Sequence, residues 1–105
     1  MKYTEHSLNI LTAIEFNGIG NAWVIRNLSH CPPYEEIVAL LNNKIPKKEQ
    51  VTNEIFISVR KQIEQKFIEI ENYCDGVTAV GEPDFPLIRG NVTDSEKPVV
   101  LFYKG

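Results

Sequence analysis

The sequence predicts a mainly α-helical fold with a small C-terminal β element. Up to residue 76, apolar residues recur every three or four positions in four segments, which glycine, proline or asparagine separates. After Gly76 the pattern changes to two short runs rich in β-branched and aromatic residues. We therefore expect a four-helix domain over residues 1–76, followed by a two-stranded β extension over residues 77–105.

The first two helices are predicted at residues 8–16 and 23–28, because apolar side chains keep helical spacing in both segments. Between them, residues 17–21 interrupt the pattern with two glycines on either side of one aliphatic residue. The second helix is expected to stop within residues 29–33, since the two prolines there cannot continue it.

The third helix is predicted from Pro33 to Lys44. Proline suits the first turn of a helix, and the two glutamates that follow complement the positive end of the helix dipole. The fourth helix is expected over residues 51–74, with its end at Asp75-Gly76. Its buried face is predicted from apolar residues that recur every three or four positions: Ile55, Val59, Ile63, Phe67, Ile70 and Cys74.

The two predicted strands cover residues 77–80 and 99–103. Between them we expect a turn at residues 82–86 and a single helical turn at Leu87-Ile88, closed by Gly90-Asn91. The last strand is apolar and has at most one visible partner, residues 77–80. The chain therefore looks like the front part of a larger protein.

Composition places the chain among soluble globular domains. Its 105 residues are enough for one modest core, and a net charge of −3 does not favour a surface that coats nucleic acid. No apolar stretch approaches the ~20 residues that cross a bilayer, and no signal segment opens the sequence. We expect a cytoplasmic protein without a membrane partner, in which Cys31 and Cys74 are reduced, buried thiols.

The turn at Gly18-Ile19-Gly20 is the strongest candidate for a binding site. Two helices joined by such a turn form a helix-hairpin-helix, in which unpaired N–H groups of the second helix point at a DNA phosphate. Asn21 stands where a lysine or arginine usually strengthens the motif, and Arg26 is the nearest cation. The alternative interpretation is a structural turn that packs two helices closely.

No arrangement in the sequence predicts catalysis. His6 and His30 lack a second ligand or base at useful spacing, and we interpret them as surface or capping residues. The serines lie in no nucleophile motif, and no metal or cofactor site is predicted. Trp23 and the other aromatic residues are expected in the core. The sequence thus predicts a protein that is not an enzyme and needs no cofactor.

The chain resembles the N-terminal region of the DNA-processing protein A (DprA/Smf) family. Its hairpin, residues 11–28, is similar to the opening helix-hairpin-helix of that family. Residues 75–80, followed by Asp84 and Phe85-Pro86, look like the family's glycine–strand passage and its aspartate and tyrosine-proline pair. The tail, residues 94–105, is similar to the segment that leads into the family's nucleotide-fold domain.

The resemblance implies a sterile-alpha-motif-like (SAM-like), non-catalytic domain that precedes a Rossmann-like domain absent from residues 1–105. In the family that second domain binds single-stranded DNA, dimerises and helps to load the strand-exchange recombinase during natural transformation. We therefore expect a role in DNA uptake and recombination, with weak, sequence-independent DNA contact at the turn. A recombinase or a regulatory protein is an expected partner of the full-length chain. The expected DNA-binding residues are Gly18, Ile19, Gly20, Asn21 and Arg26.

Two other functions stay open on the sequence alone. A small helical domain with nearly neutral charge also suits a protein-interaction or regulatory module. The domain could equally be a structural cap that packs on the Rossmann-like domain. In that case the last strand, residues 99–103, would lack its natural neighbours in isolation and would be poorly ordered or pair with another copy.

Overall fold

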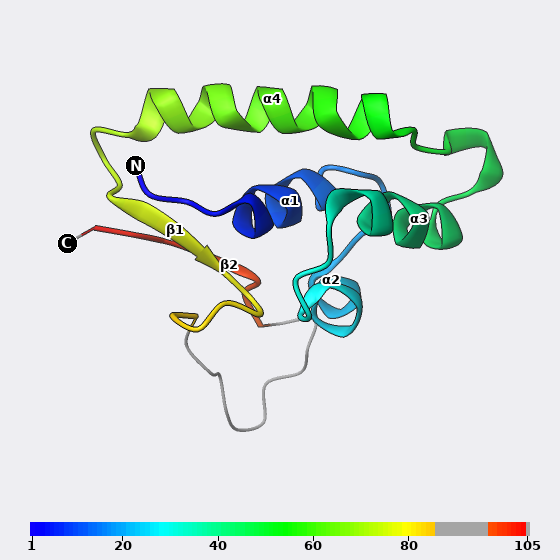
Figure 1. Cartoon of the computed structure of the whole chain (residues 1–105), viewed down its shortest axis with the longest axis horizontal. Helices are drawn as coiled ribbons and strands as arrows, with labels where there is room; N and C mark the ends of the chain where they lie inside the picture. The colour runs from blue at the N-terminus through cyan, green and yellow to red at the C-terminus, as the bar shows by residue number, and fades with distance from the viewer. Residues whose placement is uncertain (86–96, 105) are drawn as a thin grey trace.

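The computed structural model describes residues 1–85 and 97–104, and it confirms a mainly helical fold with a two-stranded antiparallel sheet (Figure 1). The predicted turn at Leu87-Ile88 and Gly90-Asn91 lies outside the described residues. In chain order the elements are α1 (Glu5–Ala13), α2 (Asn21–Leu28), α3 (Tyr34–Lys44), a 3-10 turn η1 (Lys47–Glu49), α4 (Asn53–Ile70), β1 (Gly76–Ala79) and β2 (Val100–Tyr103).

Helix α1 begins and ends three residues earlier than predicted. Thr4 is its N-cap: the Thr4 hydroxyl accepts a hydrogen bond from the Ser7 N–H at 3.0 Å, and the Thr4 N–H donates to the Ser7 hydroxyl at 3.1 Å. Such a reciprocal cap satisfies two N–H groups that the helix itself cannot. The first turn is polar, and apolar spacing therefore did not reveal it.

Helix α4 is shorter than the predicted 51–74, and its buried face agrees with the prediction at Ile63 and Phe67 but not at Ile55. Thr52 caps its start, and the helix ends at Ile70, so that Gly76 belongs to β1 instead of ending the helix. The buried positions are Phe56, Ile63 and Phe67, whereas Ile55 is 46% exposed. Of the three consecutive apolar residues at positions 55–57, only the aromatic Phe56 is buried.

The sheet pairs β1 with β2 as predicted; β1 is shifted by one residue toward the N-terminus, and β2 begins one residue later than predicted and ends at the predicted residue. Gly76 lies opposite Tyr103, and Ala79 lies opposite Val100. On the other side of β1, Lys2 forms a parallel bridge to Gly76 through hydrogen bonds of 2.8 Å to the Asp75 carbonyl and 3.0 Å from the Val77 N–H. The backbone of Lys2 thus pairs with the edge of β1 that lies opposite to β2.

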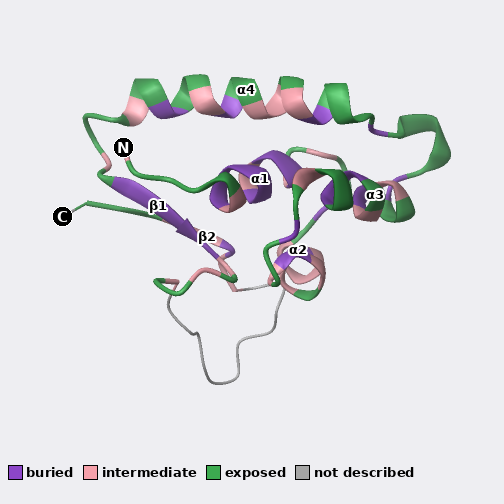
Figure 2. Cartoon of the chain, viewed as in Figure 1, coloured by how far each residue is buried: buried purple, intermediate pink, exposed green. Residues whose placement is uncertain are grey.

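One face of the sheet packs on α1 and α4. Val77 contributes to a cluster with Leu8, Ile63 and Phe67, and Ala79 belongs to the larger cluster that also contains Phe56. Figure 2 shows β1 and most of α1 buried, while α4 is exposed along the side turned away from them. The β element therefore shares its core with the helices.

Two expectations about burial were wrong. Cys31 is exposed and Cys74 is only half-buried; both are free thiols. Among the aromatic residues, Phe56 and Phe67 are buried and Trp23 is half-buried, but four are exposed: Tyr3, Tyr73, Phe102 and Tyr103. The exposed aromatic residues lie near the N-terminus, after α4 and on β2, where the described part of the chain supplies no covering element.

In the described ranges, no helix is both long and apolar enough to cross a membrane.

Candidate nucleic-acid interface

The turn between α1 and α2 requires a glycine at position 18. Gly18 has a φ angle of +84°, in the left-handed region that side chains with a Cβ rarely adopt. Ile19 follows it and is buried in the larger cluster, with its N–H bonded to the Phe16 carbonyl at 3.3 Å. Ile19 thus anchors the turn from inside, and Gly18 provides the bend that lets it do so.

Unlike Gly18, Gly20 has a backbone conformation that does not require glycine. It is the N-cap of α2 with φ −110° and ψ 177°, an extended conformation open to any residue, and no side chain of the described residues caps the helix. Among residues 1–85 and 97–104, no atom lies within 4 Å of the Cβ that a larger residue would place there, and the same holds for Gly18. The described part of the chain therefore leaves the backbone at the start of α2 open to close approach.

The first N–H groups of α2 carry the partial positive charge of the helix N-terminus. The first α2 backbone bond runs from the Val24 N–H to the Gly20 carbonyl at 3.1 Å, so the N–H groups of Asn21, Ala22 and Trp23 have no acceptor within the helix. This arrangement is the one that anion-binding helix ends use.

Asn21 holds a distant segment with its side chain. Its amide Nδ2 donates to the main-chain carbonyl of Lys97 at 2.9 Å, across 76 positions of sequence. The contact places Lys97 beside the turn, where the sequence had shown no cation next to the second glycine. No local pattern could reveal this, because the residues meet only through the fold.

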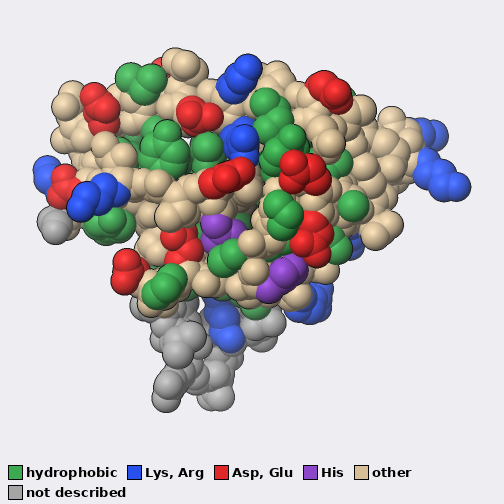
Figure 3. All heavy atoms as spheres, viewed as in Figure 1, with side chains coloured by type: hydrophobic (Ala, Val, Ile, Leu, Met, Phe, Trp, Pro, Cys, Tyr) green, Lys and Arg blue, Asp and Glu red, His purple; other side chains and the backbone are tan. Residues whose placement is uncertain are grey.

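Arg26 lies away from the N-terminal end of α2. It is exposed in the last turn of the helix, about 9 Å along the axis from Gly20 at the standard rise per residue. Of the five predicted residues, the structure therefore brings four together at the turn, residues 18–21, and sets Arg26 apart. On the face drawn in Figure 3, Lys and Arg side chains are scattered among acidic and apolar ones, without a broad basic field.

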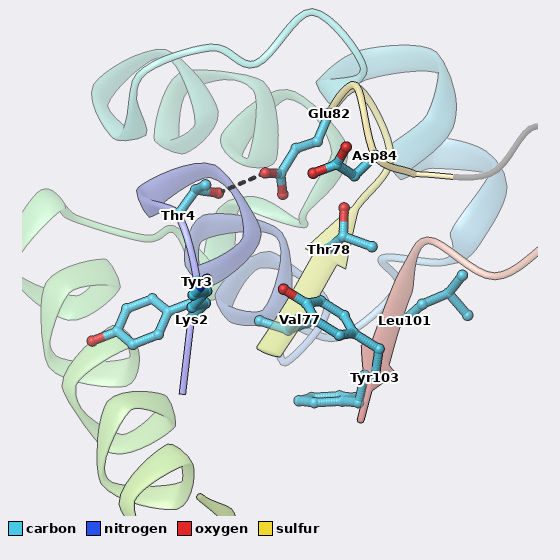
Figure 4. Close-up of a pocket in the computed structure, with 10 residues that line it drawn as sticks. Lys2, Tyr3, Thr4, Val77, Thr78, Glu82, Asp84, Leu101 and Tyr103 are labelled. Atoms are coloured by element: carbon cyan, nitrogen blue, oxygen red, sulfur yellow. Dashed lines mark hydrogen bonds between the residues drawn. The ribbon is translucent and has the colours of Figure 1, made fainter. Parts of the chain in front are cut away.

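Apart from the turn, a groove lies beside the sheet, with a volume of about 670 Å³. None of its described lining residues belongs to a helix. Figure 4 shows the Thr78 hydroxyl pointing toward Glu82 and Asp84, and Tyr103 lying further along the sheet. The described lining residues are Lys2, Tyr3, Thr4, Val77, Thr78, Glu82, Asp84, Leu101, Phe102 and Tyr103.

The Glu82 carboxylate in this groove has a structural role. One oxygen accepts the Ala79 N–H at 3.0 Å, and the other accepts the Thr4 hydroxyl at 3.1 Å, which joins the turn after β1 to the cap of α1. The Thr78 hydroxyl oxygen is buried without a hydrogen-bond partner. Cys31 lies beside the turn that follows β1. Although the residue as a whole is exposed, partial desolvation of its thiol raises the pKa, and the nearby Glu82 carboxylate raises it further.

The described residues contain no cluster of three or more His, Cys, Asp or Glu side chains that could hold a metal ion. His30 is paired with Glu36 at 3.5 Å on the surface, and His6 Nε2 lies 2.7 Å from the Val80 carbonyl oxygen. Each histidine thus makes a contact that gives it a structural role.

No protein family, curated protein or solved structure matches the chain.

Proposed function

We propose that this chain is a non-catalytic, cytoplasmic domain of a DNA-processing protein that acts in DNA uptake and recombination, and that it contacts the DNA backbone weakly at the turn before α2. The observation that supports the proposal best is the start of α2, where no described side chain caps the helix, no described atom lies close to Gly20, and the first N–H groups have no acceptor within the helix. Sequence-independent contact follows, because these groups meet phosphates rather than bases.

The expected affinity is low. Few cations of the described residues lie near the turn: Lys97 lies beside it through its main chain, and Arg26 is displaced along the helix. Binding that neutralises few phosphates is weak and falls with rising salt, and even good non-specific binders have dissociation constants of about 10⁻⁴ to 10⁻⁶ M. We expect a Kd toward the weak end of this range at low salt.

The proposal is tested by fluorescence anisotropy with labelled single- and double-stranded oligonucleotides at low salt. The decisive variant is Gly20→Asp, since aspartate is a preferred N-cap and has open space, so that it preserves the fold while placing a negative charge at the phosphate site. The matched control is Gln65→Glu, which adds the same charge on the exposed face of α4.

We expect Gly20→Asp to abolish the anisotropy change and Gln65→Glu to leave it almost unchanged. No binding by the native chain up to near-millimolar protein would remove DNA contact from the function. Equal binding by the two variants would show that the turn is not the contact site.

A second candidate function, a structural cap or a protein-interaction module, is favoured by the groove beside the sheet. Leu101 is half-buried and Tyr103 is 43% exposed on this surface, and no described helix contributes to its lining. If a following Rossmann-like domain or a recombinase covers it, Leu101 and Tyr103 side-chain signals will shift in spectra of the longer protein or of the mixture. Unchanged signals in both would leave this surface without such a role.

A further inference from the structure

The backbone groups of β2 divide between its two edges. On β1, the Val77 N–H is turned away from β2, because it donates to the Lys2 carbonyl at 3.0 Å. Its neighbours Gly76 and Thr78 therefore turn their N–H and C=O groups toward β2, since these groups alternate along an antiparallel pair. Their partners in the register, Tyr103 and Leu101, face β1 in return.

The same alternation turns Val100 and Phe102 outward. Their N–H and C=O groups point to the edge of β2 that is opposite to β1, and no described segment pairs with that edge. All four side chains of the strand are uncharged, and Phe102 remains 45% exposed although its ring meets Phe67 edge-on at 6.4 Å. Charge is a usual protection of an edge strand, and it is missing here along the strand itself.

We propose that this edge binds a second copy of the chain, by antiparallel pairing of β2 with β2 about a two-fold axis at Phe102. In this register the outward backbone groups of Phe102 meet those of Phe102 in the second copy. Those of Val100 meet those of Lys104. Because every outward group of one strand then faces an outward group of the other, the pairing is self-complementary, as a two-fold interface requires.

The charges near the edge permit this register. Lys104 is the only charged residue that it brings into the pairing, and Lys104 falls opposite Val100 of the second copy. The two Lys104 residues are then about 14 Å apart along the strands. That distance exceeds the Debye length of about 8 Å at physiological ionic strength, and their repulsion is largely screened.

The side chains also match across the two-fold axis. Phe102 meets its own copy on the face that carries Phe67, and Leu101 lies opposite Tyr103 on the other face. Aromatic and aliphatic cross-strand pairs of this kind stabilise antiparallel strands. The β2 strands would join the two sheets into one continuous sheet, with the groove-lining Tyr103 residues on the same side.

The first test measures the mass of the 105-residue chain by analytical ultracentrifugation up to near-millimolar concentration, with folding checked by circular dichroism. We expect a reversible dimer in the native chain. Phe102→Lys places two like charges opposite each other at the axis and should raise the dimer Kd by at least about tenfold. Tyr73→Lys is the matched control, since Tyr73 is 72% exposed but lies outside the strand, and it should dimerise like the native chain.

A charge-swap arm makes the register itself testable. Phe102→Glu alone should weaken the dimer as Phe102→Lys does, whereas an equimolar mixture of Phe102→Lys and Phe102→Glu should dimerise more tightly than either variant alone, because opposite charges then meet at the axis. A native chain that stays monomeric, a dimer insensitive to Phe102→Lys, or a mixture that dimerises no more tightly than either variant would each overturn the proposal.

Amide hydrogen exchange of the native chain provides a test without any substitution. The amides of Leu101 and Tyr103 should be protected at every concentration, because they bond to β1. Those of Val100 and Phe102 should become protected only as the concentration rises. Val100 and Phe102 amides that exchange freely at all concentrations would refute edge pairing.

Discussion

The side-chain amide of Asn21 donates a hydrogen bond of 2.9 Å to the main-chain carbonyl of Lys97, and this single contact joins the start of α2 to the segment that leads into β2. The candidate DNA site is therefore tied to the segment that precedes the candidate self-association edge. Asn21 was predicted as a DNA contact, and its side chain instead fixes the position of another part of the chain, while its backbone N–H stays at the turn.

Loss of this contact should destabilise the fold. Asn21→Ala is expected to lower the free energy of unfolding by about 1 kcal/mol, the net contribution of one partly buried hydrogen bond, measured by urea denaturation. Asn43→Ala is the control, because Asn43 is exposed in the last turn of α3. Equal losses in the two variants would show that the bond contributes nothing to stability.

Gly76→Ala should be destabilising for a steric reason. The added methyl group would meet the Tyr103 ring and lie 2.9 Å from the Lys2 carbonyl oxygen, closer than a Cβ approaches such an atom. We expect a loss of about 1–3 kcal/mol in the free energy of unfolding, the usual cost of overpacking. Thermal or urea denaturation measures it.

The control for this glycine is Gly20→Ser, because Gly20 has open space and an extended backbone. Serine is also a preferred N-cap residue, and stability should stay equal or rise. If Gly76→Ala were as stable as the native chain, the close contact between β1 and Tyr103 would not exist in solution.

Arg60 should matter more for stability than an exposed ion pair would. Its guanidinium donates to the buried Asn9 side-chain oxygen at 2.8 Å and to Glu5 at 3.2 Å, and it lies 5.3 Å from the centre of the Tyr34 ring. Arg60→Ala leaves the Asn9 acceptor buried without its donor, for which we expect a loss of about 1–3 kcal/mol by urea denaturation.

Glu5→Ala isolates the surface part of that interaction. The Glu5 side chain is 69% exposed, and exposed ion pairs contribute about 0–1 kcal/mol. The loss should therefore be clearly smaller than for Arg60→Ala. A loss as large for Glu5→Ala would place the stabilisation in the ion pair instead of in the buried amide.

The Cys31 thiol should react slowly with alkylating reagents near neutral pH. Burial and the Glu82 carboxylate both raise its pKa, so the reactive thiolate is scarcer than in an ordinary cysteine at the same pH. The rate of iodoacetamide modification, followed by mass spectrometry on the Cys74→Ser variant, should rise with pH about a midpoint above the ordinary cysteine value. Glu82→Gln should shift that midpoint downward, and a midpoint at or below the ordinary value would contradict the prediction.

The helical part of the fold followed from local rules. Apolar spacing, the prolines after α2 and the glycines before it are local features, and they were sufficient to predict four helices in the right order. The predicted helix ends were less accurate, because polar capping residues such as Thr4 and Ser7 do not contribute to an apolar pattern. Similarly, the choice of Phe56 over Ile55 depended on which side of α4 meets the rest of the core.

The sequence by itself determined the turn at Gly18, since only a glycine adopts that backbone angle readily, and it determined two strands after α4, because short β-branched runs bounded by turn residues suit little else. Tertiary structure alone decided that Lys97 lies beside Asn21, that Lys2 bonds next to Gly76 and that Phe102 lies at an edge of β2 with which no described segment pairs. These relations join residues far apart in the chain. They exist only once the core has formed, because burial of the helices on the sheet fixes the register and the direction of each backbone group.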